Sequence, residues 1–337
     1  MIKMTRKLPL KELSQNLLGS DYVLLGGLGF DQRCLEVLKN FPRERTVNII
    51  GISNIGSAKF SQNNISAFRE LAGPNSVVLG EDAKNIIEIA DEVSMCINNI
   101  LKVRSPKSLL VDITAMSHEL LTVVLGILNS KDILNKITLL YVGASQYSFN
   151  TKDNEIWLSR GVKDIRSVLG FPGTMLPSRK LHLILLAGFE VERAAEVILR
   201  YEPTSLSIGK GARTQSISEK HHQDNKLFFD RLNEFLAQQS FYNEKINHFE
   251  FSCVDPVRTK NDLLKHINEL PGSQERNIVI CPLNTKISTV GAALVAIERP
   301  DIQLCYAEPM EYNADGYVKP DEQVSIIDLS DQAVANC

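Results

Sequence analysis

Two stretches of the chain, about 170 residues apart, carry the same pattern of side chains. Residues 111–129 (VDITAMSHELLTVVLGILN) and 281–299 (CPLNTKISTVGAALVAIER) each pass from an apolar strand, through a short polar turn, into an apolar helix. In an open parallel sheet such a turn lies at the carboxyl end of a strand, where the ligands of these folds bind. The repeat therefore predicts two related α/β units, each with a candidate site at this turn.

Two further matches occur in the same order along the chain. Residues 29–33 (GFDQR) match 188–193 (GFEVER), and Arg-x-x-Glu-Val opens the next helix in both halves, at 33–37 and 193–197. Residues 137–148 match 302–313 without a gap, so that Tyr141 pairs with Tyr306 and Tyr147 with Tyr312. Matches at nearly constant spacing indicate an internal duplication.

Strand and helix patterns alternate through the first half. Short apolar runs at 22–25, 47–52, 76–79, 109–113 and 137–142 predict strands, and residues 31–40, 61–72 and 82–103 have helical spacing. Alternation of this kind favours a parallel sheet with helices on both faces. We predict an α/β protein of two tandem Rossmann-like units, at 1–172 and 181–337, joined by a linker at 173–180 that contains Pro and Gly.

Composition narrows the functional classes. The net charge of −3 gives no overall basic field for duplex DNA or RNA. The six cysteines form no CxxC pair, so we expect free thiols in a reducing cytoplasm and no metal site. No apolar run reaches the 18 residues of a membrane span, and we expect no contact with a membrane.

The first candidate site is the glycine-containing turn after the first strand of each half. Its G-x-G-x-x-G pattern is incomplete, and no acidic residue follows the second strands, which argues against a dinucleotide cofactor. Asp31 and Glu190 can serve simply as acids at helix N-termini. Arg33 and Arg193, present in both halves, can instead bind a phosphate or carboxylate.

The second candidate site is the turn of the repeated stretch. Asp112 closes the strand, and Thr114 or Ser117 can cap the following helix. Thr114, Ser117 and His118 are also the candidate catalytic residues of a hydrolase, although the G-x-S-x-G nucleophile motif is absent. In the second half, Asn284, Thr285 and Lys286 offer amide, hydroxyl and ammonium donors that suit an anion at a helix N-terminus.

A third candidate site is the basic loop that contains Lys210 and Arg213. It can hold phosphate or remain a solvated loop. His221 and His222 follow it, but no carboxylate or cysteine lies at ligand spacing around them, so we predict no metal. Tyr147 and Tyr312 follow strand ends and can either stack on a base or pack at the rim of the core.

The second site resembles that of the CRISPR-associated Rossmann-fold (CARF) family and, in the two-unit layout, the related SAVED sensors. Those proteins carry a D-[IL]-[TS]-G-G-T-K loop over a bound cyclic oligonucleotide. Residues 112–114 (DIT) match the start of this motif, and Thr285 and Lys286 match its end. The chain departs from it at residues 115–116, which are Ala-Met in place of Gly-Gly, and at Pro282, which replaces the Asp. The resemblance covers about seven residues in each half and implies nucleotide sensing.

Three hypotheses follow. The first is a cytoplasmic nucleotide-sensing or regulatory subunit of a bacterial antiviral defence system, with an anionic nucleotide-like ligand between its two units. Such a subunit requires no cofactor, acts through a separate effector protein and can form a homo-oligomer. The second is a hydrolase of a nucleotide or phosphodiester that uses Thr114, Ser117 and His118 with Arg33 or Lys286. The third is a partner-binding scaffold of a defence complex, in which the turns only cap helices.

Overall fold

The chain forms two compact α/β units. A computed structural model describes residues 5–54, 58–74, 76–147, 157–238, 246–314 and 317–329. The first unit comprises Met1–Lys152 together with Ala314–Cys337, and the second comprises Asp153–Asn313. Of the six cysteines, Cys337 lies outside the described residues, and the other five are free thiols. Within the described ranges no helix is both long and apolar enough to cross a membrane.

The first unit is built on a seven-stranded sheet with the order β1-β13-β6-β5-β2-β3-β4. Five of its strands are parallel, namely β2 (Tyr22–Leu28), β3 (Thr46–Ser53), β4 (Ser76–Leu79), β5 (Leu109–Asp112) and β6 (Thr138–Tyr147). β13 (Val318–Asp328) runs antiparallel to β6, and β1 (Thr5–Pro9) runs antiparallel to β13. The parallel core therefore carries two antiparallel strands at one edge.

The second unit is built on a six-stranded sheet with the order β10-β9-β8-β11-β12-β7. Its five parallel strands are β8 (Lys180–Leu186), β9 (Ser205–Gly211), β10 (Asn247–Phe251), β11 (Arg276–Pro282) and β12 (Gln303–Tyr312). β7 (Ser159–Pro172) runs antiparallel to β12. Numbered along the chain within each unit, the parallel strands of both sheets lie in the order 3-2-1-4-5, which confirms the predicted pair of Rossmann-like units.

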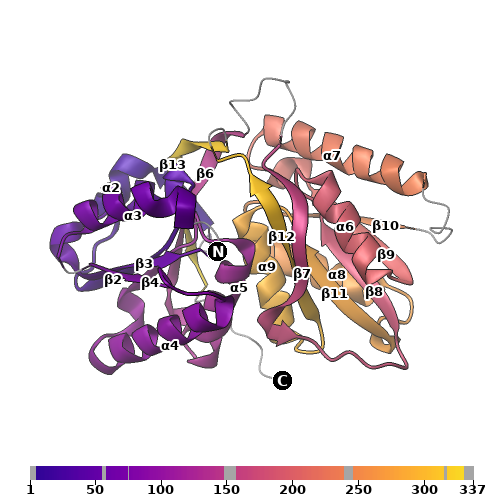
Figure 1. Ribbon diagram of the computed structural model, residues 1–337, viewed down its shortest axis with the longest axis horizontal. Coiled ribbons are helices and arrows are strands. Elements are labelled where there is room, and N and C mark those ends of the chain that lie inside the picture. The colour runs from indigo at the N-terminus through magenta and orange to yellow at the C-terminus, as the bar shows by residue number, and fades with distance from the viewer. Residues whose placement is uncertain are drawn as a thin grey trace. The chain divides into compact units, whose positions relative to one another are not determined.

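The two halves of the sequence exchange the antiparallel strands that lie next to their parallel cores. β7 follows β6 along the chain but pairs with β12, and β13 follows β12 but pairs with β6 (Figure 1). The registers match as well, because Tyr312 lies opposite Ser159 and the equivalent Tyr147 lies opposite Val318. The chain consequently passes between the units twice.

Helices cover both faces of each sheet. In the first unit they are α1 (Leu13–Asn16), α2 (Glu36–Lys39), α3 (Ala58–Ala72), α4 (Ile86–Val103) and α5 (His118–Ser130). In the second unit they are α6 (Val191–Tyr201), α7 (Glu219–Ala237), α8 (Pro256–Glu269) and α9 (Lys286–Glu298). On one face of each sheet the helices pack in pairs, α4 on α5 in the first unit and α8 on α9 in the second. On the other face, α2 and α3 share one cluster of core side chains in the first unit, and α6 and α7 share the equivalent cluster in the second. Burial on both faces explains why the central strands are apolar without alternation.

The structure divides the chain at other residues than the sequence predicts. The predicted linker, 173–180, lies wholly within the second unit and is tied to β11. The Asn277 side chain donates to the carbonyl of Leu176 at 2.8 Å and accepts from its N–H at 3.0 Å. Because a Pro- and Gly-containing stretch is also typical of an ordered loop between strands, its composition did not distinguish the two cases.

The strand exchange predicts how fragments of the chain behave. Fragment 153–313 contains every strand of its own sheet, so we expect it to unfold cooperatively in urea. Fragment 1–152 lacks β13, which separates β1 from β6, so we expect it to aggregate or remain unfolded until a peptide of residues 314–337 is added. Circular dichroism during urea titration measures both results. Independent folding of fragment 1–152 with unchanged stability would contradict the exchange.

Candidate functional site

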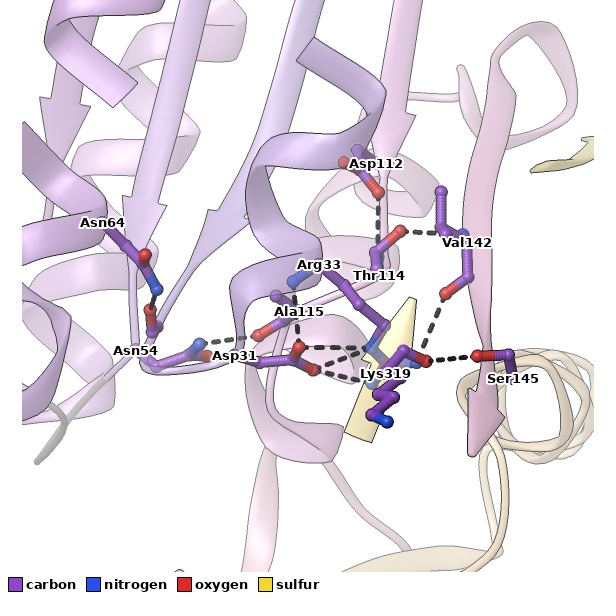
Figure 2. Close-up of polar contacts among 11 residues, drawn as sticks. Asp31, Arg33, Asn54, Asn64, Asp112, Thr114, Ala115, Val142, Ser145 and Lys319 are labelled. Carbon is purple, nitrogen blue, oxygen red and sulfur yellow. Dashed lines mark hydrogen bonds and ion pairs between the residues drawn. The ribbon is translucent and has the colours of Figure 1, made fainter. Parts of the chain in front are cut away.

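The first turn of the first unit is organised by a buried ion pair between Asp31 and Arg33. Nε and Nη2 of Arg33 donate to Oδ2 of Asp31 at 3.0 and 2.6 Å, and its Nη1 donates to the carbonyl of Val142 on β6 at 3.3 Å (Figure 2). Oδ1 of Asp31 also accepts from the Arg33 N–H at 3.0 Å and so caps the short 3-10 helix Gln32–Leu35. The arginine is 5% exposed and the aspartate 8%.

The second unit repeats this arrangement. Arg193 pairs with Glu190 and donates through Nη2 to the carbonyl of Ala307 on β12 at 2.6 Å. Val142 and Ala307 occupy the same position in the matched segments 137–148 and 302–313. Burial is the largest effect on the pKa of each arginine and lowers it, but the neighbouring carboxylate and the nearby tyrosines together hold that pKa above its ordinary value. Both guanidinium groups therefore remain charged and hold the first turn against the fifth parallel strand.

The glycines of the first turn make room for the protein's own backbone. A Cβ atom on Gly27 would lie 2.6 Å from the backbone nitrogen of Met116, and one on Gly188 would lie 1.8 Å from the carbonyl oxygen of Leu283. The turn after the first strand therefore packs directly against the turn after the central strand. This packing explains the glycines without a bound pyrophosphate, in agreement with the incomplete dinucleotide motif.

Asp112 is the last residue of β5 and directly precedes the turn that leads into α5. Its Oδ1 accepts from the Thr114 N–H at 3.0 Å, and Oγ1 of Thr114 accepts from the Val142 N–H at 3.0 Å (Figure 2). Burial raises the pKa of Asp112 to about 7, although hydrogen bonds from Thr114 and the charge of Arg33 oppose the shift. The carboxyl group therefore changes charge near neutral pH, and it does so beside the buried Arg33–Asp31 pair.

Asparagines that the sequence analysis missed complete the carboxyl edge. Asn54, just after β3, donates to the carbonyls of Leu28 and Ala115 at 3.0 and 2.7 Å and accepts from the Ser117 N–H at 2.7 Å. Asn64 on α3 donates to the Gly29 carbonyl at 2.7 Å. These side chains satisfy backbone groups that the turns leave without partners in the sheet.

One of these asparagines is duplicated. Asn225 on α7 donates to the carbonyl of Gly188 at 3.2 Å, as Asn64 does to that of Gly29, and each is the seventh residue of its helix. Extending the matched segments into α3 and α7 would have revealed the pair, since the two helices occupy the same place in the two halves.

The helix after the central strand begins in the same way in both units. Ser117 caps α5 by accepting from the Leu120 N–H at 3.0 Å, and Thr285 caps α9 by accepting from the Ser288 N–H at 3.1 Å. A basic residue then opens each helix, His118 in α5 and Lys286 in α9, and both are partly exposed. Of the predicted catalytic residues, Thr114 is buried, whereas Ser117 and His118 reach solvent.

The other predicted residues of the second unit divide into two places. Asn284 lies at the turn beside Thr285, where its side chain donates to the Ala187 carbonyl at 2.5 Å and accepts from the Thr285 N–H at 2.8 Å. Lys210 lies at the end of β9 and forms an ion pair with Glu250 at 3.5 Å. Arg213 forms an exposed pair with Glu219 at 3.1 Å, so both basic residues of this loop already have acidic neighbours.

The paired tyrosines lie close to the buried arginines. Tyr141 and Tyr147 interact electrostatically with Arg33, and Tyr306 and Tyr312 do so with Arg193. Burial raises the pKa of Tyr312, while Arg193 and a hydrogen bond with Tyr306 oppose that shift. The first tyrosine of each pair is buried and the second is partly exposed, so the second can still contact a ligand.

The arrangement offers each unit a polar edge with a rigid interior and an accessible rim. The interior consists of the carboxylate, arginine and asparagine side chains, whose polar groups bind the turns. The rim consists of the capped helix N-terminus with its basic first residue. Among the described residues no group of three or more His, Cys, Asp or Glu side chains is placed to hold a metal ion. Such a rim can bind an anion without a metal.

Comparison with known proteins gives no family. No family model matches the chain, and no curated protein matches its sequence. Among solved structures, the chain is similar to the cytoplasmic domain of a prokaryotic cation chloride cotransporter, with 11% sequence identity and a TM-score of 0.25 over 88% of this chain and 99% of that chain. A similarity this low carries no functional argument.

The raised pKa of Asp112 predicts a pH-dependent stability. Because the folded-state pKa of about 7 lies above the ordinary 3.8, the folded protein binds the extra proton, and stability falls as pH rises from about 4 to about 7. Asp112→Asn keeps the acceptor for Thr114 and removes the charge. We expect the variant to be more stable than the wild type at pH 8 by roughly 1–3 kcal/mol, with a smaller difference at pH 4.5. Urea unfolding at both pH values measures the effect, and Asp91→Asn, exposed on α4, is the control. A difference that does not depend on pH would contradict this assignment.

The buried ion pairs predict a structural contribution from both arginines. Arg33→Ala leaves Asp31 as a buried carboxylate without its partner, and Arg193→Ala does the same to Glu190. We expect each substitution to lower the free energy of unfolding by about 3–5 kcal/mol. Arg200→Ala, exposed on α6, should change it by less than about 0.5 kcal/mol. Unfolding in urea distinguishes a structural arginine from one that only binds a ligand, because removal of the latter would leave the free energy of unfolding unchanged.

Proposed function

We propose that the chain binds an anionic, nucleotide-like ligand at the carboxyl edge of its sheets and acts as a sensing or regulatory subunit of a bacterial antiviral defence system. One observation carries the binding part. The helix after the central strand begins in both units with a capping hydroxyl followed by a basic residue, Ser117–His118 in one and Thr285–Lys286 in the other.

A cation at this position, as Lys286 is in α9, works against the helix itself. The N-terminus of a helix carries a partial positive charge, so a cation there typically costs a few tenths of a kcal/mol, and an acidic residue is the stabilising choice. An anionic ligand reverses this balance, because the helix dipole and the basic side chain then attract the same group. Retention of this pairing in both units therefore favours a phosphate-bearing ligand.

The residues around the two helix N-termini suit the remainder of a nucleotide. Tyr147 and Tyr312, partly exposed at the ends of β6 and β12, can stack on a base. The turns are held by hydrogen bonds of three buried side chains, Arg33, Arg193 and Asp112, which stabilise the site without facing the ligand. The defence role and a separate effector rest on the resemblance to CARF and SAVED proteins at Asp112–Thr114 and Thr285–Lys286.

A second candidate function is hydrolysis of a nucleotide or phosphodiester in the first unit. The observation that favours it is the partly exposed Ser117–His118 pair, which follows the buried Asp112, whose pKa burial raises to about 7. Pro282 replaces this aspartate in the matched stretch of the second unit. Chemistry would therefore be confined to one unit, with His118 as the accessible base.

Calorimetry with linear and cyclic nucleotides tests the proposal. We expect His118→Ala and Lys286→Ala each to weaken binding about ten- to a hundredfold, because a charge-assisted hydrogen bond contributes about 1.5–3 kcal/mol. Lys265→Ala, exposed on α8, is the matched control and should bind as the wild type does. If the first unit is hydrolytic, His118→Ala abolishes turnover while binding persists in the second unit. Absence of binding across the panel would overturn the proposal and leave the scaffold hypothesis.

A further inference from the structure

A polar cavity lies at the opposite edge of the second sheet, away from the turns described above. Its volume is about 590 Å³, within the range of small-molecule sites. The side chains that line it are all polar, namely Arg179, Asn268, Ser273, Gln274, Arg299 and Asp301. They come from segments that directly precede β8, β11 and β12 or end the helices before them, and so they gather at the amino edge of the parallel sheet.

The two arginines of the cavity differ in the bonds that they make within the protein. Arg299 forms a two-pronged ion pair with Asp301, through Nε at 2.9 Å and Nη2 at 2.8 Å, which fixes the plane of its guanidinium. Arg179 is half-buried, and its guanidinium has no hydrogen bond or ion pair with any residue that the structure describes. Its charge does act on Asp301, which places it near the Arg299–Asp301 pair. The lining side chains carry two positive charges and one negative charge, on a chain whose net charge is −3.

The loop that forms one wall of the cavity is held rigidly. Asn277 on β11 donates to the carbonyl of Arg179 at 3.2 Å as well as to that of Leu176, and the Thr174 N–H donates to the Asp301 carbonyl at 3.0 Å. The backbone at Arg179 is therefore fixed before any ligand arrives. A fixed arginine whose own donors have no partners in the protein is prepared to bind a carboxylate or phosphate.

We propose that this cavity binds a small phosphorylated and hydroxylated anion of the sugar-phosphate class, with Arg179 and Arg299 on the phosphate. The excess positive charge selects an anion, and guanidinium groups bind phosphate through paired donors. Ser273, Gln274 and Asn268 supply the hydroxyl and amide groups that bind ligand hydroxyls. Among the residues that the structure describes, those lining the cavity include no aromatic or aliphatic side chain that could serve as a platform for a nucleobase. The ligand therefore differs from the nucleotide proposed for the carboxyl edge.

The position of the cavity suggests a modulating ligand. Arg299 is the C-terminal capping residue of α9, the helix whose N-terminus carries Thr285 and Lys286. The 13 residues of α9 span about 20 Å, and nearly all of its side chains are buried. Carboxyl-edge sites are the usual catalytic and binding sites of such sheets, so a site at the amino edge does not compete with them.

Titration calorimetry of the full chain with ribose 5-phosphate, and separately with inorganic phosphate, tests the proposal. We expect ribose 5-phosphate to bind more tightly than phosphate, and both to bind more weakly at high salt. Arg179→Ala should weaken binding about tenfold or more without lowering the melting temperature, because the guanidinium makes no bond within the described protein. Arg179→Lys keeps the charge but loses the paired donors and should give an intermediate affinity.

Two controls separate this site from the one proposed above. Arg200→Ala, at an exposed arginine of the same unit, should bind ribose 5-phosphate as the wild type does. Lys286→Ala should also leave ribose 5-phosphate binding unchanged, and Arg179→Ala should leave nucleotide binding unchanged. The cavity proposal fails if the wild type binds neither probe at up to about 10 mM, or if Arg179→Ala binds as tightly as the wild type. Neither failure affects the nucleotide proposal, which is tested separately with His118→Ala and Lys286→Ala.

Discussion

Backbone carbonyl and N–H groups at the carboxyl edge of each sheet need partners, and this requirement determines most of the polar chemistry in the protein. Where parallel strands end and turns begin, the ladder stops, and a buried peptide group without a partner costs about 1–3 kcal/mol. Each unit meets the need with one arginine held by an acid and one asparagine from the helix after the second strand. Arg33 and Asn64 do so in the first unit, and Arg193 and Asn225 in the second.

These hydrogen bonds distinguish the buried residues, which have a structural role, from the partly exposed residues at the rim. Each guanidinium already binds a carboxylate and a strand carbonyl, and burial keeps ligands away from it. The first side chains of α5 and α9 lie at the partly exposed rim of each edge. There the two units differ, because His118 follows the titrating Asp112 along the chain in one, and Lys286 follows Pro282 in the other. The duplication thus preserved the frame of the edge while the rim acquired different acid–base properties.

Much of the fold could be predicted from the sequence, because duplication makes weak local signals agree with one another. The alternation of strands and helices, the parallel order and the equivalence of residues 29–33 and 188–193 all follow from local patterns. The grouping of Asp31 with Arg33 and of Glu190 with Arg193 also follows, since each pair lies within one turn. The internal commitment of the arginines to Val142 and Ala307 could not be predicted, because it joins segments more than 100 residues apart.

The strand exchange was beyond sequence reasoning for a more general reason. Two duplicated units present equivalent fifth strands, so an antiparallel strand that follows β6 finds the same pairing edge on β12 as on β6. The local preferences of β7 and β13 do not distinguish these partners, and the chain topology decides between them, as in domain-swapped oligomers. Within a single chain the exchanged strand has a high effective concentration at its partner. The entropy cost of closing the intervening segment grows only slowly with its length. The outcome is that each sheet is completed by a strand from the other half of the sequence. The sheet of the first unit consequently depends on β13, which follows the second unit along the chain and pairs with β6 up to Tyr147.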